Sequence, residues 1–196
     1  GADDSAALDP GALPSLDEFA GTTATDESGA SERDDPAAAA ERGVHPFPGG
    51  EAAALDRLSA YVREGDHLRE YRETRNGLLG ADYSSKFSPW LNEGCLSPRR
   101  VDEEVADYER ERVANDSTYW LRFELRWRDF FQFQLLKHGR RFFAPGGLRR
   151  RDDVEWRWDE RDFERWAAGE TGVPFVDANM RELNATGYLS NRGRQN

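Results

Sequence analysis

Apolar residues recur three and four positions apart in several stretches of this chain, which is the spacing of one helix face. This spacing predicts helices over residues 52–64, from Pro98 onward, over 118–138, over 162–168 and over 171–187. No stretch alternates apolar and polar residues over a convincing strand length, and no internal repeat is visible. The predicted fold class is therefore mainly α.

Capping residues mark where two of these helices begin. Ser97 is predicted to be an N-cap with Pro98 at the first helical position, and Asn-Asp-Ser at 115–117 offers caps for the helix over 118–138. Gly139 is predicted to end that helix. The side chains expected to face inward are Leu55, Leu58, Tyr61, Val62, Val101, Val105, Tyr108, Val176, Met180 and Leu183.

Composition divides the chain near Pro46. Residues 1–45 are rich in Ala, Asp, Gly, Ser and Thr and poor in large apolar residues, which predicts a largely disordered interdomain linker. Residues 46–196 are predicted to form the domain proper. Dense polar chemistry continues up to Asn196, so we expect a chain cut within a domain and preceded by another one.

The charge balance narrows the class of protein. The chain has 196 residues, 37% hydrophobic and 33% charged, a net charge of −11 and no apolar run long enough to span a membrane. The first residues show no basic segment followed by an apolar one, so no secretory signal is expected, and the single cysteine, Cys95, favours a reducing cytoplasm. Of 27 basic residues only Lys86 and Lys137 are lysines, as in a haloarchaeal cytoplasmic protein, although a GC-rich genome also favours arginine. The three histidines are dispersed, so no metal site is expected.

One predicted helix carries an acid among aromatic rings. Trp120, Glu124, Trp127 and Phe131 share a face, and Arg128 lies one turn beyond Glu124. A carboxylate is costly to bury among rings unless something bonds to it. The stripe therefore indicates a site for a flat ligand with a polar edge. The alternative is an aromatic core helix in which Glu124 pairs with Arg128.

Two other stretches have phosphate-binding chemistry. Residues 82–91, DYSSKFSPWL, place three serines and Lys86 in a turn where hydroxyls, backbone N–H groups and an ammonium can hold a phosphate. The alternative is a turn that caps a helix. Residues 137–151 are basic, contain two aromatics and no acid, and form either a phosphate-facing patch or a solvated loop.

The end of the chain is also polar. Asn191, Arg192, Arg194 and Gln195 can grip a phosphate or read a base edge, although a polar helix end is the alternative. Three tryptophans within residues 156–166 suit packing or DNA contact, and an indole can also relay an electron.

Taken together, the ordered segments DYSSKFSPWLNEGCLSPR, STYWLRFELRWRDFF and GETGVPFVDANMRELNATGYLSNRGRQN, with YRETRNGLLG upstream, resemble the photolyase/cryptochrome family. The details SSKFSPWL, WRDFF and NRGRQN are most similar to the DASH cryptochromes, which act as photolyases on single-stranded or looped DNA. The resemblance covers about residues 47–196. It implies an all-helical FAD-binding domain in which blue light excites reduced FADH⁻, which donates an electron to a flipped-out cyclobutane pyrimidine dimer.

The resemblance also implies roles for single residues. Contacts with FAD are implied for Tyr71, Ser84, Ser85, Lys86, Phe87, Ser88, Trp120, Arg128, Asn191 and Arg194. Glu124 matches the carboxylate that hydrogen-bonds the dimer, and Trp127 matches the aromatic that stacks on it. Gln195 is implied at the lesion, and Trp156 matches the outer tryptophan of the chain that photoreduces FAD.

Departures from the family limit what this chain is expected to do alone. Compared with the family, we expect this chain to lack the antenna domain, which in the parent would hold a chromophore such as a folate, and the part of the helical domain that follows Asn196. We expect the parent to be a monomeric deoxyribodipyrimidine photolyase that binds DNA containing pyrimidine dimers. By itself, this chain is expected to bind FAD poorly and to repair nothing. The alternatives are a blue-light receptor of the same family and a helical interaction module that ignores flavin.

Overall fold

A computed structural model describes residues 42–151 and 153–195 of the chain. Regular structure in these residues is entirely helical, and no strand occurs among them. This confirms the predicted mainly α class. The linker predicted for residues 1–45 lies, up to Glu41, outside the described residues.

The first predicted helix is formed, but it changes type near its end. Helix α3 spans Glu51–Ser59 and continues as one π-helical turn, η3, over Ala60–Glu64. The prediction that Leu55 faces inward is wrong: Leu55 is 38% exposed, and the neighbouring Ala54 is fully buried. Tyr61 and Val62 are fully buried, as predicted.

The two long helices begin at the capping residues that the sequence predicts. In α6, Pro98–Glu111, the Ser97 hydroxyl accepts from the Arg99 backbone N–H at 3.3 Å, and Pro98 occupies the first turn. Helix α7, Asp116–His138, starts with a capping box in which Asn115 and Thr118 each bond the other's backbone N–H. It ends at Gly139, as predicted.

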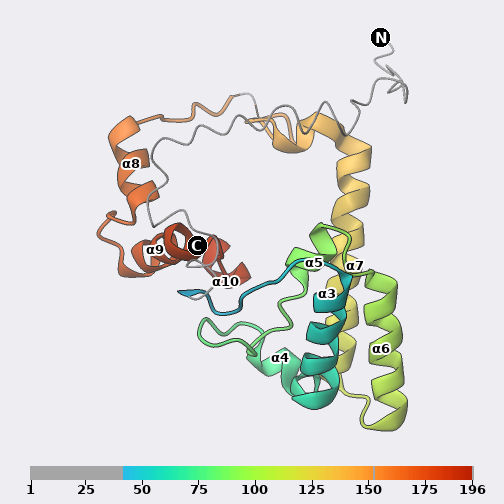
Figure 1. Ribbon diagram of the computed structural model, residues 1–196. Helices are drawn as coiled ribbons and strands as arrows, with labels where there is room; N and C mark the ends of the chain where they lie inside the picture. Colours follow the sequence, from blue (N-terminus) through green and yellow to red (C-terminus); the bar gives the residue numbers. More distant parts are fainter. Residues whose placement is uncertain (1–41, 152, 196) are drawn as a thin grey trace, which may run out of the picture. The chain divides into compact units, whose positions relative to one another are not determined.

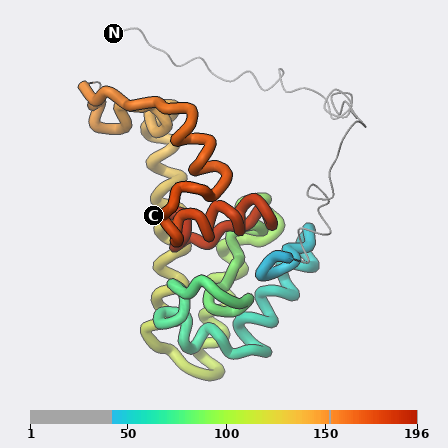
Figure 2. The backbone as a smooth tube through the Cα atoms, turned by 90° about the vertical axis from the view of Figure 1, so that its left-hand side faces the viewer, coloured from blue at the N-terminus to red at the C-terminus, as the bar shows by residue number. Residues whose placement is uncertain are grey.

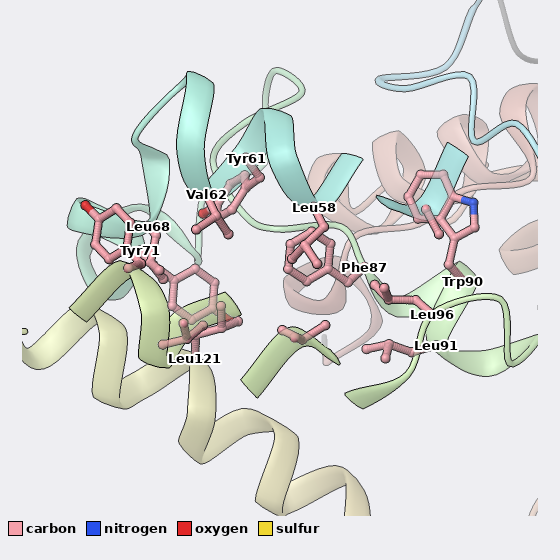
Figure 3. Packing of buried hydrophobic residues seen from close by; sticks show 14 residues of the cluster. Leu58, Tyr61, Val62, Leu68, Tyr71, Phe87, Trp90, Leu91, Leu96 and Leu121 are labelled. Atoms are coloured by element: carbon pink, nitrogen blue, oxygen red, sulfur yellow. The ribbon is translucent and has the colours of Figure 1, made fainter. Parts of the chain in front are cut away.

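A single hydrophobic core lies between α3, α6 and the beginning of α7 (Figure 3). Figure 1 shows α6 antiparallel to the first half of α7, and α7 continues well beyond the level at which α6 begins. The core residues are Ala54, Leu58, Tyr61, Val62, Leu68, Tyr71, Phe87, Trp90, Leu91, Leu96, Val101, Val105, Tyr108 and Leu121. Because Phe87, Trp90 and Leu91 belong to this core, the turn-rich stretch after residue 75 is anchored to it at one end.

Several short elements escaped the sequence analysis. They are η4 over His67–Glu70, α4 over Tyr71–Thr74, α5 over Ser88–Asn92, η5 over Gly139–Phe143 and α10 over Asn191–Arg194. Each has four or five residues, too few for an apolar spacing to identify.

The last two predicted helices are formed by α8, Glu160–Ala168, and α9, Pro174–Thr186. Figure 2 follows the chain from α7 through α8 into α9 and α10. Met180 is buried as predicted, but Val176 and Leu183 are only half-buried. Asp177 is buried instead, because its carboxylate accepts from the Thr171 and Gly172 backbone N–H groups at 2.7 and 2.9 Å and so closes the turn before α9.

Candidate functional site

The turn over residues 81–88 contains an unusual buried cation. Lys86 is only 4% exposed and adopts a left-handed backbone conformation, with φ of 55°. Its Nζ has no hydrogen-bond partner among the described residues and lies 3.2 Å from the centre of the Tyr83 ring. Burial, together with the nearby charge of Arg57, lowers the pKa of Lys86 to about 8. A buried ammonium without a hydrogen-bond acceptor is costly in free energy, and a bound anion would offset that cost.

Other hydrogen-bond donors in this turn are also free. Among the bonds found in the described residues, none is donated by a backbone N–H between Asp82 and Ser88, or by the hydroxyls of Ser84, Ser85 and Ser88. The serines cap no helix, because α5 starts at Ser88 without a side-chain cap. The capping turn considered as an alternative is therefore not formed. We call residues 81–88 the cradle; it combines an ammonium, hydroxyls and amides, the donor set that suits a diphosphate.

The cradle is held in place by packing against the core and against the segment that follows α9. Phe87 is 2% exposed and packs edge-on against the Tyr61 ring, at 5.8 Å between centroids, so only its backbone is available to a ligand. Beside the cradle, the Tyr83 and Tyr188 hydroxyls lie 3.5 Å apart. Tyr188 follows α9 and stacks on Phe47 at 5.2 Å.

The inner part of the α7 stripe is a bonded carboxylate. Glu124 Oε1 accepts from Trp120 Nε1 at 3.2 Å and pairs with the Arg75 guanidinium, which lies 5.1 Å from the centre of the Trp120 ring. Glu124 does not pair with Arg128. The Arg128 guanidinium donates instead to the Leu91 carbonyl at 3.2 Å, because that side of α7 faces the end of α5.

The outer part of the stripe consists of open aromatic rings. Trp127 is 42% exposed and stacks on Phe131 at 5.8 Å, and it meets Phe123 and Phe130 edge-on at 5.9 and 5.3 Å. The stripe thus changes character along its length, from a bonded carboxylate to an exposed ring face.

Residues near the end of the chain approach the same region. The Arg192 guanidinium donates to Asn76 Oδ1 at 2.6 Å and to Gln195 Oε1 at 3.1 Å. Arg194 donates to the Leu189 carbonyl at 3.1 Å, and Asn191 is exposed.

Segment 75–91 is the common neighbour of these groups. It contains the cradle and reaches Glu124 through Arg75, Arg192 through Asn76, Tyr188 through Tyr83 and Arg128 through Leu91. The structure therefore brings three of the sequence-predicted groups to one segment.

Tyr71 lies at the start of α4 next to this segment. It is buried in the core, and burial raises the pKa of its hydroxyl to about 12. Trp156 stands apart from the group. It is 70% exposed, and its indole N–H donates to the Pro145 carbonyl at 3.2 Å.

Other kinds of site are not found in the described part of the chain. Residues 42–151 and 153–195 contain no group of three His, Cys, Asp or Glu side chains arranged to hold a metal ion. No helix among them is long and apolar enough to cross a membrane. A hollow of about 720 Å³ lies between residues 69–73 and 115–117, and a second, of about 250 Å³, lies between residues 65–74 and Asp82. Of the stretch predicted to bind a phosphate, only Asp82 lines either hollow.

Known proteins resemble this chain over most of its described length. Residues 120–196 match the family described as the FAD-binding domain of DNA photolyase. Cryptochrome DASH of the haloarchaeon Natronomonas pharaonis is 69% identical over 80% of this chain and 33% of its own length. Cryptochrome DASH of Xenopus laevis is 56% identical over 79% of this chain and 29% of its own length.

Solved structures agree with these sequence matches. The Synechocystis cryptochrome crystal structure superimposes with a TM-score of 0.77 at 60% identity, over 80% of this chain and 32% of the other. A class III photolyase from Agrobacterium tumefaciens gives 0.59 at 33% identity, over 74% of this chain and 29% of the other.

These matches and the helical fold place the chain in the photolyase/cryptochrome family, as a part of its helical FAD-binding domain. Within that family it is similar to the proteins called cryptochrome DASH. The chain spans about a third of the length of the curated relatives that it matches.

Proposed function

We propose that the protein containing this chain binds FAD and uses blue light to split cyclobutane pyrimidine dimers in single-stranded or looped DNA. The observation that carries the proposal is the cradle, with its buried, unbonded Lys86 ammonium and its free amides. Those donors fit the diphosphate of FAD. When bound and reduced, FAD supplies the excited electron that splits the dimer, while the chain's own residues hold the cofactor and the lesion.

In this proposal the cofactor residues surround segment 75–91. Lys86 and the hydroxyls and amides of residues 84–88 hold the diphosphate and ribityl groups. Trp120 and Arg128 form part of the pocket wall, and Asn191 and Arg194 face the flavin ring. Trp156 relays an electron to the cofactor from the protein surface, which its 70% exposure suits.

Glu124 is proposed to hold the dimer by a hydrogen bond. Both recorded partners of this carboxylate, Arg75 and Trp120, bond Oε1, so within the described chain Oε2 is left free to accept. The ion pair with Arg75 fixes the direction of the carboxylate, which suits an acceptor for a base N–H group.

Trp127 and Gln195 complete the lesion side of the proposed site. Trp127 offers an exposed ring for stacking, an interaction that contributes about 1–3 kcal/mol per base in proteins that bind single strands. Gln195 stands at the lesion edge, and the basic run over residues 137–151 flanks the DNA backbone.

The test is to illuminate the full-length protein with blue light in the presence of single-stranded DNA that contains pyrimidine dimers, and to measure the loss of dimers. We expect Glu124→Gln to slow repair roughly 10- to 100-fold with unchanged FAD content, because one hydrogen bond to a charged group contributes about 1.5–3 kcal/mol. Glu103→Gln, the same change at an exposed acid on α6 that contacts none of the proposed site residues, is the matched control. Repair that is absent under light, or that is indifferent to Glu124→Gln, contradicts the proposal.

The alternative is a blue-light receptor without repair activity, a role that fits the word cryptochrome in the relatives' names. The same assay separates the two functions, since a receptor binds FAD but leaves the dimers intact.

We further propose that the parent is a monomer in a haloarchaeal cytoplasm, as the net charge of −11 favours. The 196-residue chain alone is proposed to bind FAD weakly and to be inactive, because it spans a third of its relatives.

A further inference from the structure

Arg57 of α3 binds the cradle through several hydrogen bonds, which no sequence pattern predicts. It is 7% exposed, and its guanidinium donates four hydrogen bonds to residues 81–85. The acceptors are the Ser85 carbonyl at 3.1 Å, the Asp82 carboxylate at 2.8 Å, the Ala81 carbonyl at 3.1 Å and the Ser84 carbonyl at 3.3 Å. A buried arginine that uses four donors on one loop fixes the direction of that loop's peptide groups.

The direction of those carbonyls determines where the loop's amides point. In a planar trans peptide the C=O of one residue and the N–H of the next point in opposite directions. Because the Ser84 and Ser85 carbonyls are turned toward Arg57, the N–H groups of Ser85 and Lys86 are turned away from it. The Ala81 carbonyl is also turned toward Arg57, so the N–H group of Asp82 is turned away from it as well. None of these three N–H groups donates a recorded bond among the described residues.

We propose that Arg57 is a positioning residue of the cofactor site: by holding the carbonyl side of the cradle it presents the Ser85 and Lys86 amides to the diphosphate of FAD. The inference rests on the proposed function, since it assumes that the cradle holds FAD. Arg57 itself need not touch the cofactor. Its buried charge, only partly balanced by Asp82, also makes the cradle more favourable for an anion.

The experiment compares FAD with riboflavin, which has the same ring system but no phosphate. Affinities are measured by titration of the full-length apoprotein carrying Arg57→Lys. A lysine keeps the charge but cannot reach three carbonyls and a carboxylate at once. We expect the dissociation constant for FAD to rise at least about tenfold and that for riboflavin to change by less than about twofold.

Arg122→Lys is the matched control. Arg122 makes three hydrogen bonds to Asp102 and Glu109 between α6 and α7 and does not contact the cradle. Arg122→Lys should leave the affinities for FAD and riboflavin at their wild-type values. Circular dichroism of each variant checks that its helical content is unchanged.

The outcomes are distinct. Wild-type protein that binds no FAD overturns the proposed function itself. If wild-type protein binds FAD and Arg57→Lys either binds it equally well or loses FAD and riboflavin by the same factor, only the role of Arg57 is overturned. If Arg57→Lys does not fold, Asp82→Ala decides: it removes one anchor of the guanidinium, and an unchanged ratio of FAD to riboflavin affinity refutes the inference.

Discussion

The two halves of α7 carry similar residues in very different surroundings. In the first half Ser117, Thr118 and Leu121 are at most 3% exposed, and the helix contributes to the single core. In the second half Phe133 is 67% exposed and Leu136 81%. Since a helix in a protein derives most of its stability from packing, the first half is held by the core and the second half chiefly by its own backbone.

The same contrast divides the candidate site. The cradle and Glu124 are fixed by bonds to Arg57 and Arg75, next to the core. Trp127, at the start of the open half, is fixed only by neighbouring rings. The cradle and Glu124 are therefore held in place by contacts from other elements, whereas Trp127 is held by rings of its own helix. The rings of Trp127, Phe130, Phe131 and Phe133 are 42–67% exposed, so this part of α7 presents an aromatic surface.

The largest expected effect tests the contrast directly. Leu121→Ala, in the first half of α7, should lower the free energy of unfolding by about 2–5 kcal/mol, because it leaves a cavity in the core, where Leu121 is 3% exposed. The same substitution at Leu136, in the open half, should change it by less than about 0.5 kcal/mol. Urea denaturation followed by circular dichroism measures both. Equal effects would mean that the two halves of α7 are packed alike.

Sequence reasoning succeeded where the signals are local. The N-caps at Ser97 and Asn115 are confirmed because each bonds backbone groups two or three residues away. Leu55 was predicted to face inward because apolar character was the only guide; the structure buries the smaller Ala54 instead.

The missed features depend on contacts between distant residues. Arg57 looks like a polar position on an amphipathic helix, yet its partners lie 24–28 residues away. Likewise, Glu124 pairs with Arg75, 49 residues away, although Arg128 stands at the favourable spacing of four. Spacing within one helix carries no information about such partners.

A smaller effect tests whether the cradle is kept for function. Lys86→Met should raise the free energy of unfolding of the apoprotein by about 1–2 kcal/mol at neutral pH, because it removes a buried charge that has no acceptor. It should also weaken FAD binding about tenfold. Lys137→Met, at the chain's other lysine, is exposed and should change neither. A loss of stability in Lys86→Met would instead assign Lys86 a structural role.

Lys86 also predicts a pH dependence. Its pKa is lowered by burial to about 8, so the ammonium is present below that pH and is lost above it. Wild-type affinity for FAD should therefore fall as the pH rises through about 8, whereas Lys86→Met should not show this fall. Stability should change in the opposite direction: between about pH 8 and 10 the unfolded chain holds the proton that folded Lys86 has released, so the free energy of unfolding increases with pH. Affinity that is equally pH-dependent in both proteins would exclude Lys86 as the group responsible.

The smallest effect concerns Asp66, which precedes η4 and contacts the end of α6. Asp66 accepts from the Tyr108 hydroxyl at 2.5 Å and from Arg69 and Arg112 at 2.8 and 3.2 Å, and these bonds lower its pKa to about 2. A lowered pKa in the folded state means that the stabilisation is complete above about pH 4 and is lost as the pH falls toward 2. Asp66→Asn should reduce the free energy of unfolding at neutral pH by roughly 1 kcal/mol, a modest value because the side chain is 34% exposed. In this variant the free energy of unfolding should also decrease less steeply as the pH falls from about 4 toward 2.

Asparagine suits this test because it tolerates the left-handed backbone of Asp66, with φ of 53°. The control is Asp153→Asn, in the stretch between η5 and α8. Asp153 also has a lowered pKa, through its bond with Arg151, but that ion pair is fully exposed and joins no other element. Removing it should therefore leave the acid-side decline unchanged, because a local surface pair is retained in much the same form by the unfolded chain. If Asp153→Asn flattened the decline as much as Asp66→Asn, acid stability would depend on local ion pairs throughout the chain, and not on contacts that join Asp66 to α6.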